Sequence, residues 1–523
     1  MTANREGVAS DTARPRSAAG VIVLAIVIAA IALGAAGYGA SRWMESRVER
    51  QVEAAFASMR TTLGVATYGH QEFHPLSRSM AIDDVVLQPR NGATPAIKIR
   101  QLVLSGLPIF PTDSFAAGHI ELADVAIDSG AGRGAHMAHV AMEDVTATPF
   151  GPEAEQLRAL VAVPMRAGIV VPARPEIFAA IAAMSEHVRI AKADLREFTS
   201  SEGASSVAIA AVHLDDFRSG KLARLTVEGM RTANVPQSVT LDRMVLNGLD
   251  YAGMLRLLGQ FGPAGAQPDP HQALALMRFL EGFEVNDLVG PDERPGQDPG
   301  QMFHISAFKG SWGRFAGPTP TTVRFSMTAA VPIGANETGL SRSLRDAGRT
   351  SITFMIDLGL AWNDATRTFT VDPVVVSVDQ LFSTSLVASV DNFPLDILLI
   401  NPVQFSLAAG NMEAGPLTLT IRDSGMLDLA VADAAKKQGV STETARRTML
   451  DNLNMSARAA SQQNPDILRL AEAVTRFMAT SNGSLRIALT PKGHVNVMQT
   501  LQLAGINPAA ALARFTLEAG PDH

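Results

Sequence analysis

The feature that most constrains this chain is an apolar run over residues 18–40. Between Gly20 and Ala40 there is no charged residue, and the one polar side chain is Tyr38, near the far end. About 20 such residues form an α-helix long enough to cross the hydrocarbon core of a bilayer. The run therefore predicts a transmembrane anchor, which decides the solvent that the rest of the chain meets.

Two other interpretations of this run remain open. A cleaved signal peptide has a short apolar core followed by small residues, and residues 34–40 supply such an exit. A buried globular helix is the second alternative. We prefer an uncleaved anchor, because the apolar core already has signal length by Leu33 and continues to Tyr38 and Trp43, aromatic residues suited to a membrane interface.

The orientation of the anchor is predicted from its position, because the flanking charges are nearly balanced. Three arginines precede the run and three follow it closely: Arg5, Arg14, Arg16, Arg42, Arg47 and Arg50. A short segment ahead of a first span normally stays in the cytoplasm. We therefore expect residues 1–17 to be cytoplasmic and the bulk of a single-pass bacterial inner-membrane protein to lie in the periplasm.

Composition excludes several functions. The formal net charge is −7 and there is no basic tract, which argues against nucleic acid as a partner. The chain has no cysteine, so thiolate catalysis, disulfides and cysteine metal sites are excluded together. The absence of thiols also suits an oxidising compartment.

The pattern of the remaining residues predicts a β-rich α+β fold. Residues 41–62 have apolar positions at helical spacing and form a predicted juxtamembrane amphipathic helix. Extended antiparallel sheets with helical insertions are expected over residues 63–290, and a second β-rich region, a meander, over residues 301–400. Residues 401–523 are predicted to form a mostly helical α+β module, and the proline-rich segment 290–300 is a candidate boundary.

Short strands are predicted from a loosely repeated phrase. It alternates apolar and polar residues and carries an acidic or polar residue just before its last apolar position, as at residues 82–87, 120–127, 140–145, 212–217 and 241–246. Helices are predicted at 175–186, 252–261, 271–283 and 426–437, and from 508 to 515. Ser441 and Pro465 mark the start of two more.

Candidate metal ligands are few. His70, Glu72 and His74 share one face if they lie on a strand, and His136 and His139 are three residues apart. The helical zinc-protease pattern requires glutamate directly after the first histidine, where this chain has Gln71. We therefore predict that these residues are solvated polar positions and that the chain has no metal site.

Candidate catalytic motifs also fail. Residues 219–221 lack the flanking glycine and hydroxyl of a phosphate loop, and Ser311 lacks the preceding glycine of a nucleophile elbow. Asp215 and Asp216 are adjacent and point to opposite faces of a strand. The sequence therefore predicts a non-enzymatic protein with no catalytic, cofactor-binding or metal-binding residue.

The N-terminal part of the chain resembles a known family. A membrane span, a short connecting helix and strand phrases such as residues 82–87 and 120–127 resemble the AsmA-like proteins of the Gram-negative envelope and their relatives of unknown function. The resemblance covers residues 18–140 by phrase. It implies an inner-membrane protein with its bulk in the periplasm, acting in lipid handling or envelope maintenance, with no catalytic residue to carry over.

Three functions are compatible with these patterns. An open sheet lined by aliphatic residues, with 21 methionines in the chain, suits a groove for phospholipid or another lipophile. The alternative is an envelope scaffold or assembly factor that binds a protein partner. A hydrolase with dispersed residues ranks last. A sheet whose apolar face is fully covered would contradict the lipid prediction.

Overall fold

The computed structural model is β-rich, with antiparallel strands and several helices. It describes residues 52–53, 56–57, 60, 64–148 except 75, 90–95, 107–114 and 131, then 175–258 except 235–236, 277–292, 294, 300–334 except 318, 340–395, and 409–522 except 463 and 481. Among these residues no helix is long and apolar enough to span a bilayer. The predicted anchor over residues 18–40 and the segment 1–17 lie outside them.

Contacts divide the chain into two units, which we describe separately. Unit 1 comprises residues 1–150 and 187–203, and unit 2 comprises residues 151–186 and 204–523. The proline-rich segment 290–300, predicted from the sequence as a boundary, lies within unit 2. The strands on either side of it pair directly, with Gly282 opposite Ser311.

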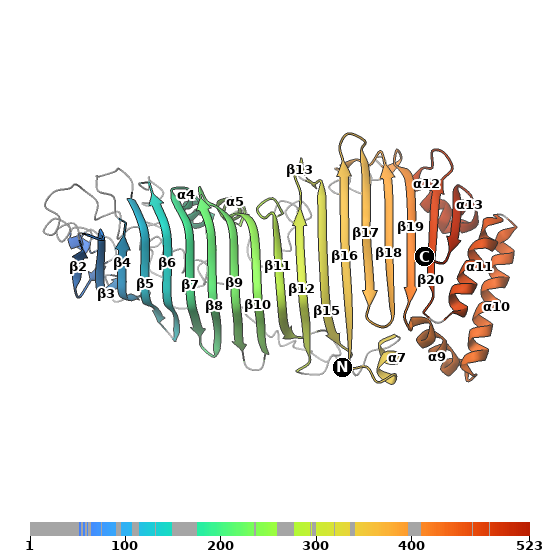
Figure 1. The fold of residues 1–523 in the computed structure, drawn as a ribbon, viewed down its shortest axis with the longest axis horizontal. Helices are drawn as coiled ribbons and strands as arrows, with labels where there is room; N and C mark the ends of the chain where they lie inside the picture. Colours follow the sequence, from blue (N-terminus) through green and yellow to red (C-terminus); the bar gives the residue numbers. More distant parts are fainter. Residues whose placement is uncertain are drawn as a thin grey trace, which may run out of the picture. The chain divides into compact units, whose positions relative to one another are not determined.

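Unit 1 is an antiparallel meander in which successive strands are neighbours (Figure 1). The two short strands β1 and β2 both pair with β3. Its strands are β1 (Gly64–Thr67), β2 (Gln71–His74), β3 (Ser79–Pro89), β4 (Ala96–Ser105), β5 (Phe115–Gly130), β6 (Arg133–Ala147) and β7 (Val188–Glu202).

The apolar face of unit 1 is buried. Leu102, Ile120, Leu122, Met137 and Met142 are all fully buried on β4, β5 and β6. Val52 and Phe56, in the described part of the predicted juxtamembrane helix, are also buried, and the Phe56 ring lies 4.6 Å from that of Tyr68. The apolar face of this sheet is therefore a closed core.

Unit 2 is also an antiparallel meander and has more strands than unit 1. Figure 1 shows β8 to β12 and β15 to β20 following one another in chain order. Its strands are β8 (Ser205–Arg218), β9 (Lys221–Asn234), β10 (Gln237–Asp250), β11 (Gly282–Pro291), β12 (Met302–Trp312), β13 (Phe315–Ala316), β14 (Thr319–Pro320), β15 (Thr322–Pro332), β16 (Ser351–Asn363), β17 (Thr368–Val378), β18 (Phe382–Asp391), β19 (Glu413–Asp423), β20 (Ser484–Pro491) and β21 (Phe515–Gly520).

The helices of unit 2 pack against one another and against its last strands. α11 packs against β20 and β21, α10 packs between α9 and α11, and α4 packs against α5. Ser441 caps α10 as predicted, since its side chain accepts a hydrogen bond from the Thr444 amide. The described helices are α4 (Pro175–Glu186), α5 (Tyr251–Leu258), α7 (Leu340–Asp346), α9 (Met426–Gln438), α10 (Thr442–Ser461), α11 (Asp466–Ala479), α12 (Val497–Ile506) and α13 (Pro508–Leu512).

The strands are longer than the repeated phrase suggested, because four of the five phrases contain an aspartate in the left-handed backbone conformation, residues 241–246 being the exception. Asp84, Asp124, Asp144, Asp216 and Asp287 all have φ between 49° and 53°. A left-handed residue inside a strand breaks the alternation of side chains, while the pairing keeps its register across it, with Asp83 opposite Gln101 and Val85 opposite Ile99. Buried residues therefore lie three apart across it, as Ile82 and Val85 do, and the strand continues where the sequence pattern seemed to end.

Two helix predictions are wrong in their extent. Phe283, placed at the end of a helix over residues 271–283, lies in β11, where it pairs with Gly310 of β12. The last helix ends at Leu512, and Phe515 begins β21 opposite Pro491. In both places two alternating apolar residues, Phe283 and Val285 or Phe515 and Leu517, pair with a neighbouring strand. These tertiary contacts outweigh the local helix propensity.

Candidate ligand-binding face

The apolar face of unit 2 is much less covered than that of unit 1. Among the described residues between Leu255 and Ala409, the buried apolar side chains are Ala329, Ile333, Leu344 and Leu381. On β16, Ile352, Phe354, Ile356 and Leu358 are half-buried, and they alternate with exposed residues. We call the half-buried face of β11, β12 and β15–β18 the open apolar face.

Strand register brings the residues of the open apolar face together. Phe325 lies opposite Leu358, Leu358 opposite Val374, and Val374 opposite Leu386, each pair on neighbouring strands. Directly opposed residues in an antiparallel sheet point to the same face. The same register adds Phe283, Val285, Phe308, Trp312, Val323, Met327, Ile356, Leu360, Val371 and Val376 to this face.

An aromatic cluster forms one part of the open apolar face. The Phe283 ring lies 4.8 Å from that of Phe308 and 6.3 Å from those of Trp312 and Phe325. Gly310 provides the space for these rings, because a Cβ there would lie 2.4 Å from the Phe283 ring. The Trp312 indole N–H donates a hydrogen bond to the Met277 carbonyl oxygen, 2.5 Å away. Sequence reasoning missed this cluster because it assigned Phe283 to a helix.

In the part of the chain that the structure describes, the two ends of β16–β18 are covered, while the middle is half-buried. At one end, Leu344 of α7 and Leu381 are buried in a cluster that includes Met426 and Leu429 of α9. At the other end, Ala409 and Met412 are buried with Val390, Phe393 and Val497 against them. The central residues, such as Ile356 and Val374, are half-buried. Among the described residues, the face is therefore closed at its ends and half-buried in its middle.

The dimensions of this face suit a long apolar ligand. Six neighbouring strands at about 4.8 Å spacing span about 24 Å. An acyl chain occupies half of a hydrocarbon core that is about 30 Å thick, so it needs about 15 Å. A continuous apolar surface of this extent is typical of a binding or interaction site in a folded protein.

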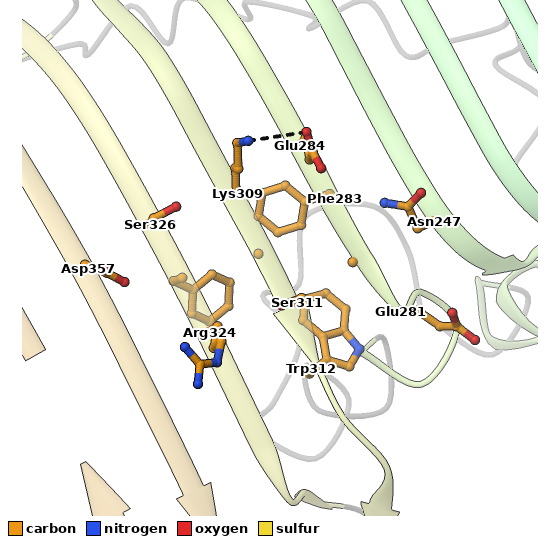
Figure 2. Close-up of a pocket in the computed structure, with 13 residues that line it drawn as sticks. Asn247, Glu281, Phe283, Glu284, Lys309, Ser311, Trp312, Arg324, Ser326 and Asp357 are labelled. Atoms are coloured by element: carbon orange, nitrogen blue, oxygen red, sulfur yellow. Dashed lines mark ion pairs between the residues drawn. The ribbon is translucent and has the colours of Figure 1, made fainter. Parts of the chain in front are cut away.

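A pocket of about 550 Å³ is lined both by Phe283, Trp312 and Phe325 of the aromatic cluster and by polar side chains of the same strands. Its side chains occupy matched positions: Glu284 opposite Lys309, Lys309 opposite Ser326, and Ser326 opposite Asp357. Lys309 and Glu284 form an ion pair, with 3.6 Å between Nζ and Oε2 (Figure 2). Arg324 and Ser311 line the same pocket, whose charges are exposed.

The histidines singled out in the sequence are on polar positions of unit 1, where His70, His74 and His136 are exposed and His139 is half-buried. His74 Nε2 lies 3.6 Å from Glu72 Oε1, and His139 Nδ1 lies 3.5 Å from Glu121 Oε1. His136 lies 3.7 Å from Asp124, and a hydrogen bond from Arg100 lowers the pKa of Asp124. No group of three possible metal ligands occurs among the described residues.

The rejected catalytic motifs have structural roles. Ser219 and Gly220 have φ values of 49° and 70°, so they form the two-residue turn between β8 and β9. Asp216 has a left-handed backbone conformation with φ 50°, whereas Asp215 pairs in register with Arg224. Ser311 lies on β12 and lines the pocket beside the aromatic cluster.

Comparison with known protein families gives a match to part of this chain. A family model described as an uncharacterized protein matches residues 375–520, which run from β17 to β21. No curated protein matches the chain. The matched segment includes β17, β18 and the C-terminal helices, and so covers one side of the open apolar face.

Proposed function

We propose that this chain is a non-enzymatic, membrane-anchored protein of the bacterial envelope that binds a phospholipid or another lipophile on the open apolar face. The observation that carries the proposal is the half-burial of a continuous aliphatic and aromatic surface over β11, β12 and β15–β18. A lipid tail on this surface removes apolar area from water and requires no specific polar contact.

The predicted anchor supports this proposal from the sequence. An apolar run over residues 18–40 holds the chain at a bilayer, where lipid is available. The resemblance to AsmA-like proteins agrees with lipid handling in the Gram-negative envelope. The adaptable side chains Met327 and Met355 lie on opposite faces of neighbouring strands, so methionine by itself does not identify the binding face.

Site-specific photocrosslinking in the full chain tests this function. A photoreactive amino acid replaces Ile356, on the open apolar face, and in a matched protein it replaces Met355, the next residue of β16, on the opposite face. After irradiation in bacterial membranes, we expect a lipid adduct by mass spectrometry at position 356 and none at position 355. Met355 is 42% exposed, so the control site is at least as accessible.

The same experiment separates the lipid function from the scaffold function. A single dominant protein adduct at position 356, without lipid, would replace lipid binding by partner binding. Equal lipid labelling at positions 355 and 356 would show contact with bulk membrane and would contradict a specific face. A second protein with Leu386→Asp tests continuity, since a charge on the adjoining face should abolish the lipid adduct at 356.

A further inference from the structure

The C-terminal end of unit 2 has a helical hairpin without charge. Residues 495–513 contain no aspartate, glutamate, lysine, arginine or histidine. They form α12 and α13, joined at Asn507. Two large apolar side chains of α12 are strongly exposed: Leu501 is 63% exposed and Ile506 is 86% exposed. Leaving both in water costs free energy that a stable fold normally avoids by burial.

The hairpin is held in place by well-defined contacts. Asn496 caps α12 by accepting from the Gln499 amide, and Asn507 caps α13 by accepting from the Ala510 amide. Ala509 and Ala511 of α13 are buried, and α13 packs against β21. α12, by contrast, has no buried residue. The structure therefore fixes α13 to the sheet and the start of α12 to Ala409 and Met412 through Val497 and Met498, and it leaves Leu501 and the tip at Ile506 exposed.

Positive charge flanks the base of the hairpin. The Lys492 amide donates a hydrogen bond to the Arg514 carbonyl oxygen, so these two residues lie together where the hairpin leaves the sheet. Lys492 Nζ also donates to the Ala513 carbonyl oxygen. Nearby, Glu413 accepts a hydrogen bond from His494 and raises the pKa of that imidazole.

We propose that the α12–α13 hairpin inserts shallowly into the surface of a bilayer that contains anionic lipid. An uncharged apolar tip with cations at its base matches the order of acyl chains and headgroups at such a surface. A protein partner is the less favoured occupant, because the cations Lys492 and Arg514 at the base of an uncharged tip complement anionic headgroups beside acyl chains. This proposal uses different residues from the open apolar face and does not depend on ligand binding there.

Fluorescence quenching in the full chain tests the hairpin. The natural sequence has no cysteine, so Ile506→Cys gives a single site for an environment-sensitive dye. The labelled chain is reconstituted in vesicles of phosphatidylcholine and phosphatidylglycerol that carry spin-labelled acyl chains. We expect a blue-shifted emission that these lipids quench. Met455→Cys on α10, 62% exposed, is the matched control and should remain unquenched.

Further variants separate insertion from incidental proximity. Leu501→Asp should remove the quenching at position 506, since it places a charge on the inserted face. Lys492→Glu should weaken the quenching in phosphatidylglycerol vesicles and leave it unchanged in pure phosphatidylcholine. Equal emission at positions 506 and 455, with no quenching at either, would overturn the proposal. Loss of the lipid adduct at position 356 would leave it intact, so the two proposals fail separately.

Discussion

At the scale of single residues, burial changes the acidity of the Tyr251 phenol. Tyr251 begins α5 directly after β10, and its ring lies edge-on to that of Phe217, with 6.4 Å between centroids. Burial raises the pKa of Tyr251 to about 12 from an ordinary value of 10.0. The neutral phenol is favoured there because the phenolate would lose its hydration.

The raised pKa predicts a pH dependence. Between pH 10.0 and about 12 the unfolded chain releases the Tyr251 proton while the folded chain keeps it, so stability falls as pH rises through this range. Tyrosinate absorbance during alkaline titration should show one of the three tyrosines ionising late. Tyr251→Phe should remove that late step. A late step that persists in the variant would contradict the assignment.

At the scale of elements, aspartates with positive φ decide where a strand changes the face to which its side chains point. Asp144 of β6 has φ 49°, and the buried residues on either side of it, Met142 and Val145, are three positions apart. Aspartate tolerates this conformation better than most residues, whereas a β-branched side chain clashes with its own backbone. The repeated acidic position in the sequence is therefore explained by backbone geometry.

Substitution of Asp144 tests whether its left-handed backbone conformation matters for stability. Asp144→Gly should change stability little, because glycine adopts positive φ freely. Asp144→Val should cost about 1–3 kcal/mol, the range for a strained backbone conformation. Urea unfolding followed by limited proteolysis compares the two variants with the natural chain. Equal losses in both would show that the aspartate side chain, and not the conformation, matters.

At the scale of the whole molecule, the two units use the same strand pattern with different covering. Leu122 in unit 1 is fully buried, whereas Leu358 in unit 2 is half-buried on the open apolar face. Both belong to strands with alternating side chains, and both face apolar neighbours on adjacent strands. The two leucines differ in how much of each side chain other residues cover.

Leucine-to-alanine substitution should report this difference. Leu122→Ala should destabilise unit 1 by about 2–5 kcal/mol, as expected for a cavity in a closed core. Leu358→Ala should cost much less, about 1 kcal/mol, because part of the side chain already meets solvent. Urea unfolding measured by hydrogen exchange in each unit compares them. Equal costs would show that the face of unit 2 is covered after all.

Much of this architecture could be predicted from residue patterns alone. Alternation predicted the β-rich fold, the meander of β16, β17 and β18, and the antiparallel pairing, because side chains in a strand alternate between faces. Local capping chemistry likewise predicted the start of α10 at Ser441. The absence of cysteine excludes thiol chemistry, and the net charge argues against a nucleic-acid partner, which stays a prediction.

Tertiary structure alone decided which apolar faces are covered. The phrases at residues 120–127 and the strand at residues 351–363 have the same alternation, yet Ile120 is fully buried and Ile356 is half-buried. Burial depends on segments distant in sequence, and a periodic pattern records only the direction of each side chain. For the same reason, the sequence did not reveal the aromatic cluster at Phe283 or the exposed tip at Ile506. The cluster is defined by neighbours distant in sequence. The exposure of Ile506 is defined by the absence of such neighbours among the described residues.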